Sequence, residues 1–149
     1  MNPGGANVVA ALQTAGAAMV DPAGRSWEWG GAIWRCLGFL SEATGRSMCA
    51  VSVIDRSGRL LVLGDAGSAD QEQLCAMYGG GLRNDLLVTE PGGALSTALV
   101  AVARPRLVAV PTAQGDHTAA APDGYTVTRT AVDGDLRFSG SRRGLIEDA

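Results

Sequence analysis

Gly67–Gly93 reads G-S-A-D-Q-E-Q-L-C-A-M-Y-G-G-G-L-R-N-D-L-L-V-T-E-P-G-G. Ser68 and Gln71 have the spacing of a capping box, in which the serine hydroxyl accepts the Gln71 backbone N–H and the glutamine side chain reaches back. Acidic residues occupy the first turn, where the helix dipole favours negative charge. Three glycines at 79–81 end the pattern. We therefore predict a helix over Ala69–Tyr78.

A short apolar strand is expected next, at Leu86–Thr89, because Pro91 and the glycines after it break the run. Farther along the chain, the segment 94–110 is apolar and rich in alanine. Its first part predicts a helix, and Leu107–Val110 predicts a strand.

Two helices are expected in the N-terminal region. Ala6–Val20 is rich in alanine, the best helix former. Ser26 can cap a second helix. The apolar residues of that helix recur at intervals of four, four and three, which is one helical stripe; they are Trp29, Ile33, Leu37 and Leu40.

Residues 48–63 fit two structures. Met48–Ile54 is apolar and partly β-branched, Asp55-Arg56-Ser57-Gly58 has good turn chemistry, and Leu60–Leu63 is apolar again. Locally this pattern predicts a β-hairpin. Short apolar runs cannot be assigned by periodicity alone, so helix remains open here.

The C-terminal third predicts a second hairpin. Tyr125–Ala131 alternates like a strand with one wet face, Asp133-Gly134 is a hairpin turn signal, and Leu136–Ser139 follows as the partner strand. Helices first and strands later give an α+β fold: an N-terminal helical part and a small antiparallel β part.

Composition bounds the class of protein. The chain has 149 residues, 46% of them hydrophobic and 18% charged, which is enough apolar material for one domain or one and a half. A net charge of −3 argues against nucleic acid as a partner. No apolar run approaches a membrane span, and the first twenty residues lack the basic start of a secretory signal.

The three cysteines, Cys36, Cys49 and Cys75, are odd in number and widely spaced. We expect each to pack as a small buried apolar residue rather than to form a disulfide or hold a metal. Reduced cysteines imply a cytoplasmic location. The single histidine, His117, lies in a polar loop and is expected to be a solvent-exposed spectator.

The stretch quoted first resembles a passage in acyl-CoA dehydrogenases. In that family a G-x-x-x-Q helix leads through a glycine to an apolar strand that ends in T-E-P-G. Gly67, Gln71, Gly81, Leu86 and Thr89-Glu90-Pro91-Gly92 fall into this pattern.

A second segment, Asp133–Arg142, is similar to the D-G-x-(aromatic)-x-(apolar)-x-G-x-(Lys/Arg) hairpin of the family's β-domain. The resemblance implies a truncated relative with a helical part at residues 1–85 and an incomplete β-domain at residues 86–149.

The resemblance implies a flavoprotein of lipid metabolism that binds FAD. It places flavin contacts at Leu86, Val88 and Thr89, and it places Leu145 in the family's second flavin strand. The chain departs from the family at 93–96, where Gly-Ala-Leu-Ser replaces a glycine-serine-aspartate element, and at 144–146, where the aromatic and hydroxyl side chains are missing.

The family's C-terminal helical bundle, which carries the carboxylate base, is also missing. We therefore assign no catalytic residue and no metal ligand, and we expect no turnover by this chain alone. An oligomer with a second acyl-CoA dehydrogenase-like subunit would be needed to act on an acyl-CoA thioester.

A function of another class is the alternative: a small non-enzymatic domain of the GAF or profilin-like kind, which binds a ligand or a partner. Ala98–Pro111, with Arg104-Pro105 before an apolar strand, resembles the A-x-x-x-x-R-P-V-x-V-P-D run of GAF domains. Residues 48–63 discriminate between the two, since a hairpin favours the alternative and a helix favours the dehydrogenase.

Overall fold

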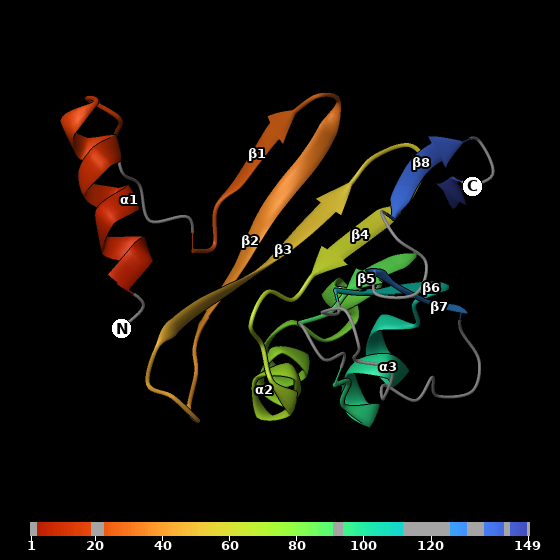
Figure 1. Cartoon of the computed structure of the whole chain (residues 1–149). Coiled ribbons are helices and arrows are strands. Elements are labelled where there is room, and N and C mark those ends of the chain that lie inside the picture. The colour runs from red at the N-terminus through yellow and green to blue at the C-terminus, as the bar shows by residue number, and fades with distance from the viewer. Residues whose placement is uncertain are drawn as a thin grey trace.

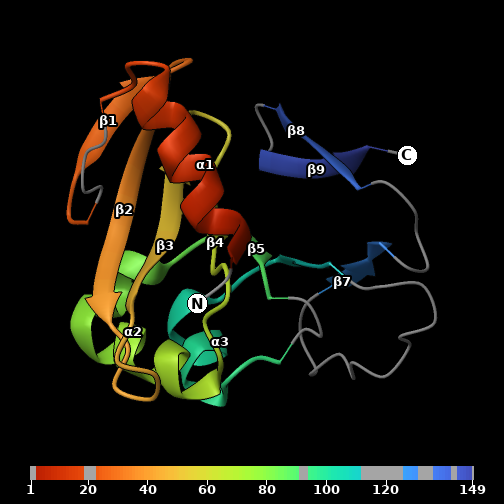
Figure 2. The ribbon, with the colours of Figure 1, turned by 60° about the vertical axis from the view of Figure 1, so that its left-hand side comes forward.

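The structure is a computed structural model that describes residues 3–18, 23–90, 94–111, 126–130, 136–141 and 144–148. A single sheet of seven strands, in the order β1-β2-β3-β4-β5-β6-β7, dominates it. Two helices, α2 and α3, lie below the sheet in Figures 1 and 2. The predicted α+β class is confirmed at this level.

The first helix of the sequence prediction is present as α1 (Pro3–Thr14). The second is wrong, because β1 (Ser26–Trp29) and β2 (Ala32–Leu40) form an antiparallel hairpin there. Gly30 and Gly31, with φ of 63° and 77°, make its two-residue turn. Two side chains that are four residues apart lie on one face of a strand as well as on one face of a helix. The apolar stripe therefore does not distinguish a strand from a helix.

Residues 48–63 form a β-hairpin, which is one of the two structures that the sequence allows. Strands β3 (Ser47–Ile54) and β4 (Arg59–Val62) are antiparallel. The Asp55 carboxylate accepts the backbone N–H groups of Ser57 (2.6 Å) and Gly58 (3.0 Å), which closes the turn. The first four strands are therefore an antiparallel meander where the sequence predicts a helical part.

After β4 the chain changes to parallel pairing. Helix α2 (Ser68–Tyr78) and the short 3-10 helix η1 (Gly79–Leu82) connect β4 to β5 (Leu86–Val88), and α3 (Thr97–Ala103) connects β5 to β6 (Leu107–Val110). The pairs β4–β5 and β5–β6 are parallel. The predicted helix at 69–78, its glycine end and the strands at 86 and 107 are confirmed.

The C-terminal hairpin prediction is wrong in its pairing. Strand β7 (Thr126–Arg129) adds to the sheet parallel to β6. Strand β8 (Arg137–Ser141) pairs instead with β9 (Gly144–Asp148), as a separate two-stranded sheet that Figure 2 shows apart from the main one. The strands after residue 85 are thus mainly parallel rather than antiparallel, and the main sheet continues across residue 85, where the sequence predicts a boundary.

The core lies between the sheet and the two helices. Most of its large fully buried side chains are leucines from β4, α2, η1, β5 and α3, among them Leu61, Leu74, Leu87 and Leu99. Burial of apolar surface stabilises this layer by about 25 cal/mol for each square ångström that is removed from water.

A buried glutamine connects α2 to the segment before α3. The Gln71 side chain donates to the carbonyls of Ala66 and Ala94 (2.9 Å each) and accepts the Ser96 N–H (2.7 Å). The capping box predicted for Ser68 and Gln71 is wrong, since α2 has no side-chain cap and Gln71 instead joins α2 to the segment before α3.

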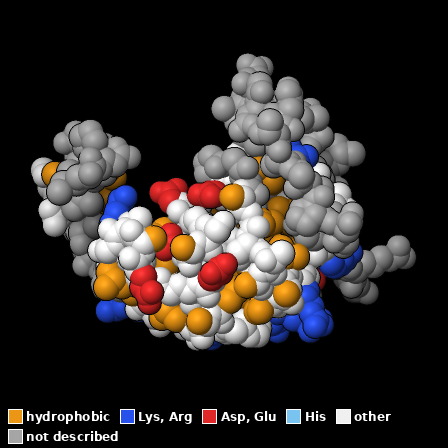
Figure 3. All heavy atoms as spheres, turned by 90° about the horizontal axis from the view of Figure 1, so that it is seen from below, with side chains coloured by type: hydrophobic (Ala, Val, Ile, Leu, Met, Phe, Trp, Pro, Cys, Tyr) orange, Lys and Arg blue, Asp and Glu red, His pale blue; other side chains and the backbone are white. Residues whose placement is uncertain are grey.

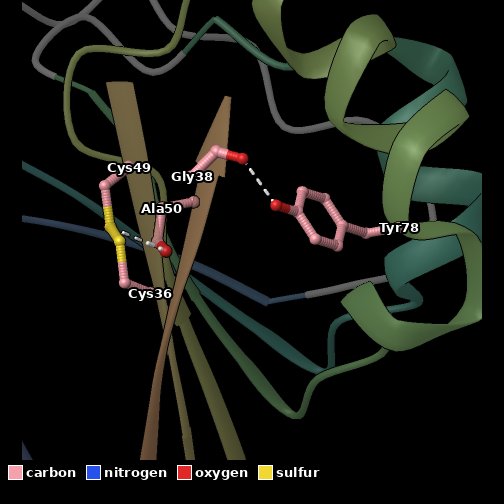
Figure 4. The surroundings of a disulfide bond; sticks show 5 residues. All are labelled: Cys36, Gly38, Cys49, Ala50 and Tyr78. Atoms are coloured by element: carbon pink, nitrogen blue, oxygen red, sulfur yellow. Dashed lines mark hydrogen bonds between the residues drawn. A yellow bond between two sulfur atoms is a disulfide. The ribbon is translucent and has the colours of Figure 1, made fainter. Parts of the chain in front are cut away.

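The cysteine prediction is wrong for two of the three residues. Cys36 on β2 and Cys49 on β3 form a disulfide, with Cα atoms 5.8 Å apart (Figure 4). Cys75 is free and half-buried. Nearby, the Tyr78 hydroxyl at the end of α2 donates to the Gly38 carbonyl at 2.6 Å, which ties the helix layer to β2.

Candidate functional site

The two faces of the main sheet differ in their burial. The face toward α2 and α3 is closed, with Leu61, Leu87 and Val108 at most 1% exposed. Strand pairing places the neighbouring positions of the same strands on the opposite face. There the side chains are again apolar, but most of them are exposed or half-buried.

We call this second surface the open face. Its exposed or half-buried apolar side chains come from six adjacent strands, β1 to β6. They are Trp27, Trp29, Trp34, Val51, Val53, Leu60, Val62, Val88 and Leu107.

Three tryptophans form one end of the open face. Trp27 stacks on Trp34, its direct partner across the β1–β2 hairpin, with ring centroids 6.3 Å apart. Trp29 lies tilted against Trp34 at 5.7 Å and remains 70% exposed. The Trp34 indole N–H donates to the Trp29 carbonyl at 3.2 Å. Trp27, which is 43% exposed, and Trp29 are therefore not core residues.

The helix α1 also has exposed apolar side chains. It stands apart from the sheet in Figure 1. Val8 and Leu12, one turn apart, are 59% and 43% exposed, and residues 10–18 are exposed throughout. A helix of 12 residues is marginal in water without packing. An unpacked helix and an uncovered apolar face therefore occur in the same chain.

The four flavin-contact residues of the sequence prediction separate in the structure. Leu86 (3% exposed) and Val88 point to the open face, where Leu86 is one of the few buried positions. Thr89 follows the β5 strand and is buried, and its hydroxyl donates to the Glu90 carbonyl at 2.9 Å. Leu145 lies on β9, outside the main sheet, and its side chain is not among those described.

An acidic hollow lies at the carboxyl end of β4. A cavity of about 330 Å³ opens between the start of β3 and the start of α2, and its charged lining consists of Asp65, Asp70 and Arg46. Asp70 is 5% exposed, and its Oδ1 atom has no hydrogen-bond partner. Burial raises the pKa of the nearby Glu90 above its usual value, and the charges of Asp65 and Asp70 raise it further.

Metal binding has no support in the described part of the chain. No group of three or more His, Cys, Asp or Glu side chains there is arranged to hold an ion. His117 lies outside the described residues. None of the described helices is long and apolar enough to cross a lipid bilayer.

Sequence reasoning missed the open face because it treated 26–40 as a helix. The available signal was Gly30-Gly31 between two aromatic, β-rich segments, which is hairpin chemistry. Unalternated apolar runs in β4, β5 and β6 are typical of parallel strands that are covered on both faces. Here α2 and α3 cover one face only.

Comparison with known proteins adds no assignment. The chain matches no protein-family model, and no curated protein and no solved structure was found to be similar to it.

Proposed function

We propose that this chain is a small interaction domain that associates with a second copy of itself through the open face. The observation that carries the proposal is the contrast between the two sides of one sheet. The helix side is packed where α2 and α3 cover it, whereas the other side keeps an apolar surface with three tryptophans at one end. Exposed apolar patches of this kind mark interaction surfaces.

Aromatic residues support an interface at this place. Tryptophan is enriched among the residues that contribute most binding energy in protein interfaces. Trp27, Trp29 and Trp34 are held in a fixed arrangement by the β1–β2 hairpin and by their mutual contacts, so little conformational entropy is lost on binding.

The occupant that we propose is α1 of the second copy. Its Val8 and Leu12 lie on one side of the helix and are 59% and 43% exposed. Covering them with the open face of a partner would bury both apolar surfaces at once. The exchange is reciprocal in a two-fold dimer, because each copy carries one helix and one open face.

This proposal belongs to the second class of function considered above. The hairpin at 48–63 is the feature that favours a small interaction domain over a dehydrogenase fragment. The dehydrogenase resemblance calls for helices before residue 85, where the chain has a four-strand meander. FAD binding, a dehydrogenase-like partner and an acyl-CoA substrate stay predictions, and an absorbance spectrum of the purified protein would test the first of them.

Light scattering coupled to size-exclusion chromatography tests the proposal. We expect a dimer for the whole chain and a monomer for Trp27→Ser combined with Trp29→Ser. Removal of residues 1–17 should also give a monomer, because it removes the helix that covers the face. Met77→Ser is the matched control, since Met77 is 54% exposed but lies on α2, away from the open face.

Three outcomes would contradict the proposal or part of it. A monodisperse monomer of the whole chain at high concentration would refute self-association. A dimer that survives the tryptophan substitutions would place the interface elsewhere. A dimer that survives removal of residues 1–17 but not the tryptophan substitutions would keep the open face and reject α1 as its cover.

A further inference from the structure

A second candidate site lies at the opposite end of the parallel strands from the acidic hollow. A cavity of about 550 Å³ opens at the amino ends of β4, β5 and β6. Its lining contains four arginines, one aspartate and one asparagine: Arg59, Arg83, Arg104, Arg106, Asp85 and Asn84. In Figure 3, basic side chains gather toward the right-hand edge of the face, while most acidic ones lie farther left.

The backbone that carries these arginines is held firmly. The Asp85 carboxylate accepts the Arg59 N–H at 2.9 Å, and the Asp85 N–H donates to the Arg59 carbonyl at 2.8 Å. The Asp85 carbonyl accepts the N–H groups of Arg106 and Leu107 at 2.9 and 3.0 Å. The three strand ends are thus joined through one residue, and the arginine side chains extend from a fixed frame.

The four guanidinium groups are not neutralised within the site. Among the residues that the structure describes, no carboxylate forms an ion pair with any of them; the one side-chain bond recorded is from Arg104 Nε to the Ala101 carbonyl at 3.4 Å. With four arginines and one aspartate, the lining has an excess of positive charge in a chain whose net charge is −3.

Arg104 occupies a backbone position that does not suit it. It ends α3 with φ of 48° and ψ of 54°, the left-handed conformation that usually belongs to glycine at a helix end. It is the one non-glycine residue with positive φ in the described chain. An arginine kept at a strained position beside three others points to a role for its side chain rather than for its backbone.

A buried asparagine also lines the cavity. Asn84 is 4% exposed, and its Nδ2 donates to the Leu82 carbonyl at 3.0 Å. Its Oδ1 atom has no partner, although a buried, unpaired carbonyl oxygen is costly. That oxygen is itself buried, so the arginines are the groups that a ligand in the cavity would contact.

We propose that this cavity, the arginine site, binds the phosphate groups of a small organic phosphate of about nucleotide size. Arginine presents a planar array of donors that matches phosphate oxygens in pairs. The volume lies within the range of small-molecule sites. Phosphate oxygens would contact the arginines.

Calorimetric titration with metal-free ATP, and separately with inorganic pyrophosphate, tests the proposal. We expect binding that weakens as salt is added. Arg83→Gln and Arg106→Gln should each weaken ATP binding by about tenfold or more, because each removes charge-assisted hydrogen bonds. Arg35→Gln is the control: Arg35 is exposed on β2, which β3 and β4 separate from β5.

Arg104→Gly separates binding from folding. Glycine relieves the left-handed strain, so the melting temperature should stay equal or rise. The same substitution removes a phosphate donor, so ATP binding should weaken. A side chain needed only for the fold would give the opposite pattern, with a lower melting temperature and unchanged ATP binding.

A lipid headgroup offers the same phosphate chemistry, so sedimentation with vesicles of phosphatidylcholine and phosphatidylinositol bisphosphate is the second arm. ATP binding without vesicle binding identifies a soluble ligand, and vesicle binding that needs Arg83 and Arg106 identifies a headgroup. The proposal is overturned if neither probe binds, or if Arg35→Gln weakens binding as much as Arg83→Gln, which would mean an unspecific effect of net charge.

Discussion

Gln71 shows how one polar side chain organises the helix layer. It is fully buried and makes three hydrogen bonds to the backbone, one to Ala66 before α2 and two across to Ala94 and Ser96 before α3. The Ser96 hydroxyl in turn accepts the Leu99 N–H at 3.1 Å and caps α3. The start of α3 is therefore positioned by a residue of α2.

Gln71→Ala should strongly destabilise the fold. It leaves the buried Ala66 carbonyl and the buried Ser96 N–H without their partner, and each such group costs about 1–3 kcal/mol. We expect the free energy of unfolding, measured by urea titration, to fall by about 3 kcal/mol or more. Glu72→Ala, an exposed position on the same helix, should change it by less than about 0.5 kcal/mol. Equal effects at both positions would refute the role given to Gln71.

Glu90 gives the acidic hollow a measurable pH dependence. Its pKa is raised in the folded state by burial and then by Asp65 and Asp70. The folded state therefore binds the Glu90 proton more tightly than the unfolded state does. Stability is lost as pH rises from the ordinary carboxyl pKa through the raised one.

Glu90→Gln removes that cost. We expect its melting temperature to exceed that of the unchanged protein by about 1–3 °C at pH 7. The difference should disappear below the ordinary carboxyl pKa, where both proteins carry a neutral side chain. A thermal scan at several pH values measures this, and a difference that does not change with pH would contradict the assignment.

Among the elements, the β2–β3 hairpin is fastened most strongly. Eight pairs of residues face each other in it, and the Cys36–Cys49 disulfide crosses it. Cysteines spaced 13 residues apart in an odd set of three gave no ground to expect the bond, because the two strands had not both been recognised. The expected cytoplasmic location depended on reduced cysteines and is left without that support.

The disulfide predicts a thiol count. Thiol titration of the unreduced, denatured protein should find one free thiol for each chain, that of Cys75, and three after reduction. Cys36→Ser with Cys49→Ser should lower the free energy of unfolding by about 3 kcal/mol. The reason is that a disulfide that closes a loop of this length lowers the conformational entropy of the unfolded chain by about that much. Cys75→Ser is the control and should change it much less. Three free thiols before reduction would disprove the bond.

The elements that could be predicted from sequence are those with local signals. The glycines at 79–81 and the turn Asp55–Gly58 fix the ends of α2 and of the β3–β4 hairpin. Pairing could not be predicted in the same way. Asp133-Gly134 is good turn chemistry, yet β7 pairs with β6, from which it is distant in sequence. Parallel pairing leaves no local mark at the turn, because the strands that meet are joined by a crossover.

On the scale of the whole molecule, the two ends of the parallel strands differ in charge. Asp65, Asp70 and Glu90 lie near the carboxyl ends, and four arginines lie at the amino ends. Net charge gave no indication of this, because −3 is the sum over both ends. The candidate sites escaped prediction for the same reason. The arginines come from three separate places in the sequence and meet only through the β4–β5–β6 topology.

The central strand β4 has a further consequence for how the chain avoids misalignment. Leucines and valines occupy both of its sides, so a slip by one residue would exchange Leu60 and Val62 for Leu61 and Leu63 with little change in hydrophobicity. Apolar pattern alone therefore cannot choose the alignment. The two hydrogen bonds between Asp85 and Arg59 fix the alignment of β4 with β5 instead. The residue that holds the backbone of the arginine site therefore also determines the register of these two strands.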